Sequence, residues 1–401
     1  MKKQGSLPAV LGGEPAFKEN VPITAPSIPS LSILKKGYEQ ILKSGMITNS
    51  QKVQEFEARV AAYLGVKHAI ALNSCTSGLI LIMKALRLTG EVIMPSFTFH
   101  ATGHAAVWNG IQPVFADCDQ ETYNLDPQAV EKAITPRTSA IIAVHLFGNP
   151  PAIYALEKIA RKHQLKLIFD AAHGFGTKYQ GRNVGGFGEA ESFSLSPTKL
   201  LTAGEGGIVA TNNSELAAQV RLGRNYGDGG DYNPTFSGLS ARMSEFHALL
   251  GIESLKMLER NVAKRNKLAG IYRQLLGNLP GITFQKIEAG NRSSYKDFSI
   301  LIDRKKLGLS RDILHDALLK ENIIVKKYFY PPLHEQVAFN QFKQINSLMV
   351  TKHIANNSLS IPLFSHMKES TAKKIAQTIR RAYNNRQAIK TEYEKNREAI
   401  R

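Results

Sequence analysis

Short runs of apolar residues alternate with longer amphipathic segments from about residue 66 to residue 211. Short apolar runs are typical of strands buried on both faces, and the segments between them have helical spacing. The predicted strands cover residues 69–73, 91–95, 112–117, 139–145, 166–170, 192–196 and 207–211, and the predicted helices cover residues 75–86, 98–109 and 153–163. Strands that alternate with helices are joined by crossovers, so the pattern predicts an α/β fold with a mostly parallel sheet.

A long helical pattern over residues 243–275 follows, and a helix of this length can connect two domains. Beyond it, the pattern predicts strands at 298–302 and 323–325 and helices at 310–320, with Ser310 as N-cap, and 369–383. This order is typical of a compact α+β unit. We expect three parts: an N-terminal segment over residues 1–45 that lies across the surface, a large domain over 46–265, and a smaller C-terminal domain over 266–401.

Composition narrows the class of protein. Of the 401 residues, 43% are hydrophobic and 21% are charged, which is ordinary for a globular protein and excludes disordered and fibrous classes. Two cysteines, Cys75 and Cys118, cannot form a disulfide framework and fit a reducing compartment. No apolar stretch approaches the ~20 residues that span a bilayer, and no apolar segment follows the basic start. We therefore expect a cytoplasmic protein without a signal peptide, a membrane partner or a metal site.

The chain is basic, because 51 Lys and Arg against 33 Asp and Glu give a formal net charge of +18. Such a charge permits nucleic acid, an anionic surface or a small anionic substrate as partner. The basic residues become denser only from Lys373 to Arg401, where Glu392, Glu394 and Glu398 accompany them. No zinc-finger spacing or aromatic-basic RNA motif is present. A solvated basic terminal helix is therefore favoured over a nucleic-acid partner.

Candidate chemistry lies just beyond the predicted strands, because ligands of parallel α/β sheets bind outside the carboxyl ends of the strands. Residues 73–78 (Asn-Ser-Cys-Thr-Ser-Gly) open a helix whose free amides and dipole favour a phosphate, with Thr76 as a hydroxyl donor. An ordinary capped helix start is the alternative. Asp170 ends an apolar strand, where an acid is costly unless it meets a cation or a protonated ring. A helix N-cap or a structural salt bridge is equally open for Asp170.

Lys199 lies beyond the strand at 192–196 and before a glycine-rich turn at 204–207. Most loop lysines are solvated, but a lysine held in an apolar pocket loses its proton readily and attacks carbonyl groups. Together the three strand ends suggest pyridoxal phosphate: the helix start holds its phosphate, Asp170 keeps its ring nitrogen protonated, and Lys199 forms the Schiff base. Phe99 is the candidate to stack on the ring, and a core phenylalanine is the alternative.

The same stretches resemble the pyridoxal-phosphate-dependent sugar aminotransferases of the DegT/DnrJ/StrS type. No single motif is specific for this family. The order of the motifs along the chain, from residue 44 to about residue 365, is specific. The matching segments are residues 44–53, 63–69, 73–77, 95–99, 145–148, 170–173, 197–199, 204–207, 242–245 and 330–334. The resemblance implies an aspartate-aminotransferase-like fold (fold type I), a homodimer with active sites at the subunit interface, and the cofactor.

The resemblance also implies a role for each matching residue. Lys199 carries the cofactor and moves a proton between the substrate carbon and the cofactor, Asp170 pairs with the ring nitrogen, His173 lies near the phenolic oxygen and Phe99 stacks. The backbone of Cys75 and the side chains of Thr76 and Ser194 hold the phosphate. Three positions depart from the family pattern: Ser240 replaces an Asn that usually reaches the partner's phosphate, Cys75 replaces Gly or Ala, and Ser196 replaces a common His.

The reaction implied is transfer of an amino group from L-glutamate to a nucleotide-linked keto sugar, favoured here as a 4-keto-6-deoxyhexose. Thr48, Asn49, Tyr330 and His334 are candidate substrate contacts, and turn packing is the alternative for the last two. A 3-keto sugar aminotransferase, a glutamine-dependent amino-cyclitol aminotransferase and a non-catalytic regulator that binds the cofactor remain alternatives. Dehydratases that resemble this family carry His in place of the lysine, so Lys199 argues against that activity.

Overall fold

The computed structural model describes residues 7–344 and 347–398. Its centre is a seven-stranded sheet whose strands lie in the order β1 (His68–Leu72), β9 (Gly207–Thr211), β8 (Ala190–Ser194), β5 (Lys166–Asp170), β4 (Thr138–Val144), β2 (Glu91–Pro95) and β3 (Gln112–Ala116). Only β9 runs against its two neighbours, β1 and β8, and the other neighbouring strands are parallel. The predicted α/β fold with a mostly parallel sheet is therefore confirmed.

Helices cover both faces of this sheet, which explains why its strands are apolar on both sides. One face packs against α2 (Gln51–Leu64), α5 (Pro127–Ala133), α6 (Ile153–Lys162) and the first part of α8 (Glu245–Leu276). The opposite face packs against α3 (Cys75–Ala85), α4 (His100–Trp108) and α7 (Ser214–Gly223). A short hairpin of β6 (Lys178–Tyr179) and β7 (Arg182–Asn183) lies outside the sheet.

A second, smaller core surrounds a three-stranded antiparallel sheet of β10 (Ile282–Phe284), β11 (Phe298–Ile302) and β12 (Ser358–Ile361). The predicted strand at 323–325 is wrong, because Ile323 makes only an isolated bridge to Val21. The strand that pairs with β11 on this side is β12. The apolar pattern did not predict β12, because its serines interrupt the run of apolar residues. Those serines are buried, and the Ser360 hydroxyl lies 2.5 Å from that of Ser299 across the strand pair.

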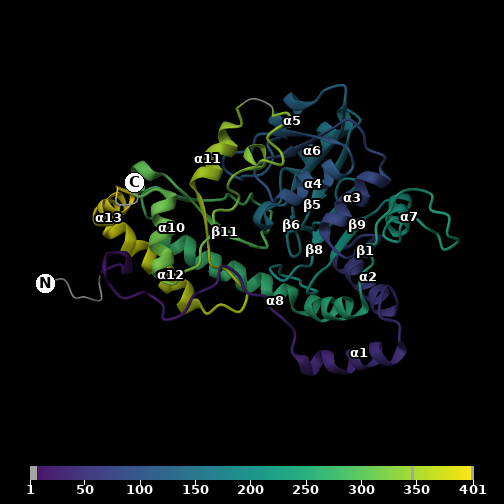
Figure 1. The fold of residues 1–401 in the computed structure, drawn as a ribbon, viewed down its shortest axis with the longest axis horizontal. Helices are drawn as coiled ribbons and strands as arrows, with labels where there is room; N and C mark the ends of the chain where they lie inside the picture. The colour runs from purple at the N-terminus through teal and green to yellow at the C-terminus, as the bar shows by residue number, and fades with distance from the viewer. Residues whose placement is uncertain (1–6, 345–346, 399–401) are drawn as a thin grey trace.

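The long helix α8 joins the two cores, as its length predicted (Figure 1). Leu258 and Val262 belong to the core of the large sheet, whereas Leu268 and Tyr272 belong to the core of the small sheet. The change of core therefore falls around the proposed domain boundary between residues 265 and 266. The remaining helices of the smaller part are α9 (Arg304–Leu307), α10 (Arg311–Lys320), α11 (Met349–Asn357), α12 (Glu369–Asn384) and α13 (Arg386–Glu398).

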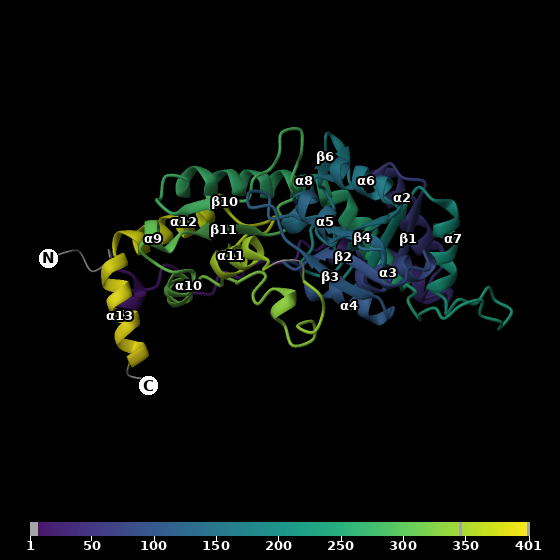
Figure 2. The same cartoon turned by 90° about the horizontal axis from the view of Figure 1, so that it is seen from above.

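The two ends of the chain differ from the sequence prediction in detail. The N-terminal segment contains an unpredicted helix, α1 (Leu31–Ser44), which packs on Leu249 of α8 through Leu34 and Ile41 (Figure 1). The basic terminal segment forms two helices, and α13 turns away from α12 at one end of the molecule (Figure 2). Arg401 lies outside the described residues. Within the described ranges, no helix combines the length and apolarity needed to cross a membrane.

Candidate active site

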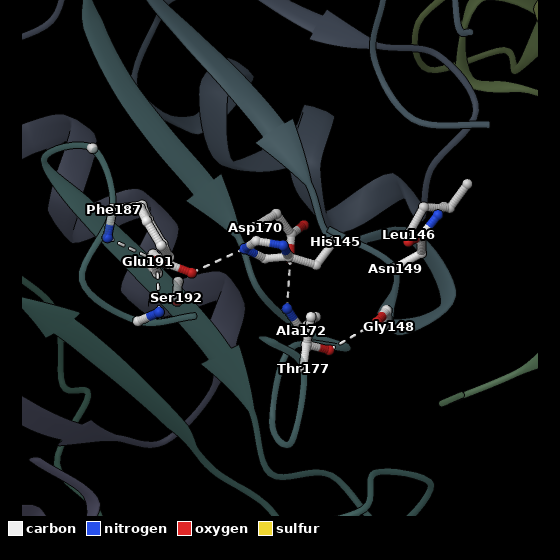
Figure 3. Close-up of polar contacts among 12 residues, drawn as sticks. His145, Leu146, Gly148, Asn149, Asp170, Ala172, Thr177, Phe187, Glu191 and Ser192 are labelled. Atoms are coloured by element: carbon white, nitrogen blue, oxygen red, sulfur yellow. Dashed lines mark hydrogen bonds and ion pairs between the residues drawn. The ribbon is translucent and has the colours of Figure 1, made fainter. Parts of the chain in front are cut away.

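Asp170 ends β5 with a buried carboxylate whose two oxygens are both hydrogen-bonded. The Thr102 hydroxyl donates to Oδ2 at 2.6 Å. The Ala172 amide donates to Oδ1 at 3.0 Å (Figure 3). Asp170 neither begins a helix nor, among the described residues, makes an ion pair. The N-cap and salt-bridge alternatives are thereby excluded. Two neutral donors fix the orientation of the carboxylate and leave its charge free for a cationic ligand group.

The start of α3 lies beside Asp170 and is open to a ligand. Ser74 caps the helix, because its hydroxyl accepts from the Ser77 amide at 3.0 Å. Among the described residues, the amides of Cys75 and Thr76 and the Thr76 hydroxyl have no partner. Gly207 of β9 lies so close that a Cβ there would be 2.5 Å from the Cys75 nitrogen. The Ser74 cap therefore does not prevent the start of α3 from binding an anion.

The Cys75 side chain has a different role from the Cys75 amide, which is free for a ligand. Its sulfur lies 3.2 Å from the Ser192 carbonyl oxygen and 4.0 Å from Asp170 Oδ1. Burial and the nearby Asp170 raise the pKa of this thiol well above its usual range. A thiol that stays protonated is a poor nucleophile, so the side chain fills space.

Lys199 lies between β8 and β9, where its amide donates to the Ser196 carbonyl at 3.0 Å and the adjacent Leu200 and Leu201 enter the large core. Burial lowers the pKa of its amine to about 8, with a further lowering from Lys296. Asp297, Cys75 and Asp170 act in the opposite direction. In the described part of the chain, the amine makes no hydrogen bond or ion pair. Lys199 is therefore a partly buried lysine that loses its proton more readily than a solvated one.

His173 follows Asp170 by three residues and is neutral. Its Nδ1 lies 3.1 Å from the Phe147 amide and accepts its hydrogen, so the proton of the ring belongs on Nε2. Burial lowers the pKa of His173 well below its usual value, and Lys199, Lys296 and His145 lower it further. A neutral ring that donates through Nε2 suits a contact with a ligand oxygen that carries negative charge.

Phe99 is exposed, unlike the phenylalanine two residues before it. Its side chain is 50% exposed, whereas that of Phe97 is 1% exposed, so the interpretation of Phe99 as a core residue is wrong. The Phe99 ring lies 3.8 Å from that of His100 and 6.4 Å from that of Phe329, measured between ring centres. An exposed ring at this edge is suited to stacking on a flat ligand.

Three residues of the site were not predicted. Thr102, which holds Asp170, lies in the first turn of α4, and only its spacing of four from Thr98 could have pointed to it. Lys296 and Asp297 form a buried ion pair just before β11. The signal for these two was a pair of opposite charges directly before an apolar strand, where charges are costly unless paired.

Four of the predicted residues belong to the large domain. Among the described residues, none of the four makes a hydrogen bond to Asp170 or Lys199. Ser194 ends β8, with its hydroxyl 3.4 Å from that of Ser196. The Thr48 hydroxyl and the Asn49 amide both donate to the Met243 carbonyl, and the Asn49 side-chain oxygen is buried without a partner. Ser240 is exposed and bridges to Asn225. Their roles toward a ligand remain predictions.

The two candidates from residues 330–334 differ from each other. The His334 ring nitrogen Nδ1 lies 2.7 Å from the Ser96 hydroxyl, which also accepts from the His334 amide at 3.0 Å. This buried contact favours turn packing for His334. Tyr330 is half exposed, and Arg311 lies over its ring at 4.7 Å. Its neighbour Phe329 reaches Phe99, so Tyr330 stays the better candidate for substrate contact.

A second buried pair, His145 and Glu191, lies close to the site but on the other face of the sheet. The two side chains meet at 2.9 Å, and Glu191 also accepts from the Gly185 and Phe187 amides (Figure 3). Glu191 is opposite Phe169 in the strand register, whereas Asp170 is opposite Ser192. Because successive side chains of a strand point to opposite faces, this pair supports the loop before β8 and not the ligand.

A mostly parallel sheet that ends in an open helix start, a fixed carboxylate and an unpaired, partly buried amine is the arrangement of a pyridoxal-phosphate-dependent aminotransferase of fold type I. Residues 33–380 match the DegT/DnrJ/EryC1/StrS aminotransferase family, and the chain belongs to it. The predicted family, fold, enzyme class and cofactor are therefore confirmed.

Three similar proteins illustrate the relationship. The chain is 34% identical to dTDP-4-amino-4,6-dideoxy-D-glucose transaminase of Escherichia coli over 90% of this chain and 98% of the relative. It is 35% identical to UDP-N-acetyl-3-dehydro-alpha-D-glucosamine 3-aminotransferase of Acidithiobacillus ferrooxidans over 86% and 92%. The crystal structure of DesI in the presence of its TDP-sugar product matches with a TM-score of 0.92 and 35% identity, over 97% of this chain and 100% of that chain.

Proposed function

We propose that this aminotransferase transfers the amino group of L-glutamate to a keto sugar linked to a nucleoside diphosphate, with a 4-keto-6-deoxyhexose as the sugar. The observation that carries the proposal is the partly buried Lys199 amine, which has no hydrogen bond or ion pair within the described chain, together with the fixed Asp170 carboxylate. The E. coli relative, a dTDP-4-amino-4,6-dideoxy-D-glucose transaminase, supports the sugar assignment.

The residues present fit pyridoxal phosphate, which when bound supplies an aldehyde for amines and a ring that accepts an electron pair. The free amides of Cys75 and Thr76, with the Thr76 and Ser194 hydroxyls, would hold the phosphate. Asp170 would face the ring nitrogen, and the Nε2 hydrogen of His173 would meet the phenolic oxygen. The exposed ring of Phe99 would cover one face.

Lys199 has two tasks in this proposal, to hold the cofactor and, once released, to carry a proton. An amine with a pKa of about 8 is partly neutral at physiological pH and can accept the proton of the substrate carbon. It would then pass this proton to the bound cofactor, and the same transfer would run in reverse when the keto sugar is the substrate. Burial keeps competing water away from this transfer.

We propose that the enzyme is a homodimer. Large exposed apolar side chains gather on α1 and on the residues that follow it: Leu31, Ile33, Leu42, Met46 and Ile47. Such a concentration of large exposed apolar side chains is typical of a protein interface. In such a dimer Ser240 would reach the phosphate bound by the partner subunit, and Thr48, Asn49 and Tyr330 would contact the sugar or the donor. Light scattering is expected to give twice the chain mass, and Leu42→Asp is expected to shift it toward the single chain; a wild-type monomer would contradict the dimer.

The amino donor and sugar are tested together by incubating the enzyme with dTDP- and UDP-linked keto sugars and either glutamate or glutamine. The product is identified by mass spectrometry and NMR. We expect 4-amination of a dTDP-linked sugar with release of 2-oxoglutarate. Exclusive amination at C3 would favour the second candidate, a 3-keto sugar aminotransferase, which the Acidithiobacillus relative supports. Turnover of none of these substrates would contradict both. We place the reaction in the cytoplasm, in keeping with the two free cysteines.

A further inference from the structure

A cavity of about 720 Å³ lies beside α8, near the point where this helix passes from the large core to the small core. Its walls come from three segments that are far apart in the sequence: residues 26–28, residues of α8 between 257 and 264, and residues 365–366. Residues 26–28 belong to the N-terminal segment that runs from the small part of the molecule to α1 (Figure 1). None of the residues that we assign to the cofactor lines the cavity, so it is separate from that site. Its volume is in the range of ~300–1,000 Å³ that is typical of ligand sites.

Two basic side chains of α8 line the cavity without a counter-charge. Arg260 and Lys264 are one helical turn apart, and neither makes a hydrogen bond or an ion pair within the described chain. Lys267 on the same helix pairs with Glu369 at 2.7 Å, whereas no acidic residue is among the described residues that line the cavity. Like charges one turn apart destabilise a helix. An anion in the cavity would relieve this repulsion.

A third positive charge lies behind the wall of the cavity. Arg265 is 1% exposed, and its side chain donates only to neutral acceptors within the described chain. These acceptors are the Ser365 hydroxyl at 3.1 Å and the carbonyl oxygens of Tyr295 at 3.2 Å and Lys296 at 2.8 Å. Ser365 itself lines the cavity. A buried cation is costly unless an anion compensates its charge, so Arg265 also favours an anion here.

Two buried polar side chains in the wall of the cavity have hydrogens that they can donate. Asn261 is 5% exposed, and its Nδ2 atom is buried without a hydrogen-bond partner in the described chain. An unsatisfied buried donor is costly, and native proteins keep few of them. The Ser365 hydroxyl accepts from Arg265 but has no acceptor of its own among the described residues, so its hydrogen is also available. The cavity thus combines unused donors with uncompensated positive charge.

We propose that this cavity binds a ligand that carries a phosphate group, with Arg260, Lys264 and the Asn261 amide as its contacts. A phosphate has several acceptor oxygens and a negative charge, which a guanidinium group matches with two parallel hydrogen bonds. Pro26 and Met257 supply an apolar wall for the rest of the ligand. The inference goes beyond the proposed function and does not depend on it. The phosphate belongs either to the nucleotide-linked substrate or to a separate compound, and the test distinguishes the two.

The test measures the binding of inorganic pyrophosphate to the full-length holoenzyme by calorimetry. Saturation with pyridoxal phosphate fills the start of α3, so that anion site does not contribute. The variants are Arg260→Met and Lys264→Met, at two exposed positions outside both cores. Lys256→Met is the matched control, because it removes one charge from the same helix at a residue that pairs with Glu253 at 2.6 Å and does not line the cavity.

We expect saturable binding by the wild type and a Kd that rises at least about tenfold in Arg260→Met and in Lys264→Met. Lys256→Met should bind as the wild type does. Asn261→Leu should also weaken binding, while the free protein stays at least as stable as wild type in thermal unfolding, because the variant removes a donor that has no partner. Lower stability with unchanged binding would contradict the role of Asn261.

The same variants identify the source of the phosphate. Weaker binding of dTDP and a higher KM for the nucleotide-linked sugar would assign it to the substrate, whereas unchanged values would assign it to a separate compound, and both results support the site. Absence of saturable pyrophosphate binding, an unchanged Kd in both charge variants, or an equal loss in Lys256→Met would overturn the inference. None of these three results affects the proposed function, which is tested by amino transfer.

Discussion

Two lysines from different parts of the molecule are withdrawn from solvent, Lys296 fully and Lys199 in part, and their surroundings differ. Lys296, which comes from the small part, is held by both oxygens of Asp297. Lys199, which comes from the loop between β8 and β9, has no hydrogen bond or ion pair within the described chain, and its pKa is lowered to about 8. Burial alone therefore does not make a lysine reactive: the amine must also lack an ion-pair partner.

The two aspartates of the site show the same contrast. Asp170 receives hydrogen bonds from a hydroxyl and an amide, both neutral, so its charge remains for the ligand. Asp297 is neutralised by Lys296. The part of the site built by the large sheet thus offers free charges for chemistry, whereas the ion pair that precedes β11 of the small sheet is already compensated.

The largest effect is expected from Lys199→Ala. Removing the amine takes away both the attachment of the cofactor and the proton carrier, so turnover should fall by at least about 10³-fold. Release of 2-oxoglutarate from glutamate is the measurement, and circular dichroism verifies that the fold is kept. Activity close to wild type would show that Lys199 is not the reactive lysine.

Asp170→Asn is expected to have the next largest effect. The side chain keeps its shape, and an amide can still accept from Ala172, but the charge opposite the ring nitrogen is lost. We expect kcat to fall by about 10²- to 10³-fold, with the cofactor still bound. Asp316→Asn, at a half-exposed aspartate paired with His315, is the matched control and should keep wild-type kcat. An equal loss in both variants would contradict a specific role for Asp170.

Lys199→Met should stabilise the cofactor-free protein below pH 8. The folded state lowers the pKa of this amine from 10.5 to about 8, so below pH 8 folding is opposed by the cost of burying the charged form. The cost decreases as the pH rises from about 8 to 10.5, because the folded amine is already neutral. We expect a gain of about 1–3 kcal/mol at pH 7 that disappears above pH 10.5, measured by urea unfolding. A variant less stable than wild type at pH 7 would contradict this.

The smallest effect is expected from Thr102→Val, which removes one of the two hydrogen bonds that orient Asp170. A hydrogen bond to a charged group is worth about 1.5–3 kcal/mol, and part of it is regained by water once the hydroxyl is gone. We expect the Kd for pyridoxal phosphate to rise about tenfold. Thr378→Val, at a helical threonine bonded to the Lys374 carbonyl, is the control and should leave the Kd unchanged. A Kd equal to wild type in Thr102→Val would show that Ala172 alone orients Asp170.

The sequence predicted the half of the site that the large sheet builds. Asp170, Lys199 and the helix start at Cys75 each follow a strand. The carboxyl ends of parallel strands lie at one edge of the sheet, and this does not depend on the conformation of the loops. Lys296 and Asp297 precede a strand of another sheet, so their place depends on how α8 packs the two parts together. Thr102 was missed because a threonine inside a helix has no distinguishing pattern. Strand β12 was missed because its buried serines read as polar.

The central claim, that Lys199 and not Lys296 is the reactive amine, is tested most directly by locating the covalent bond. The protein is incubated with pyridoxal phosphate, the bond is fixed by reduction with borohydride, and the peptides are examined by mass spectrometry. The account predicts the added mass on the peptide that contains Lys199. Added mass on the Lys296 peptide, or on neither, would contradict it.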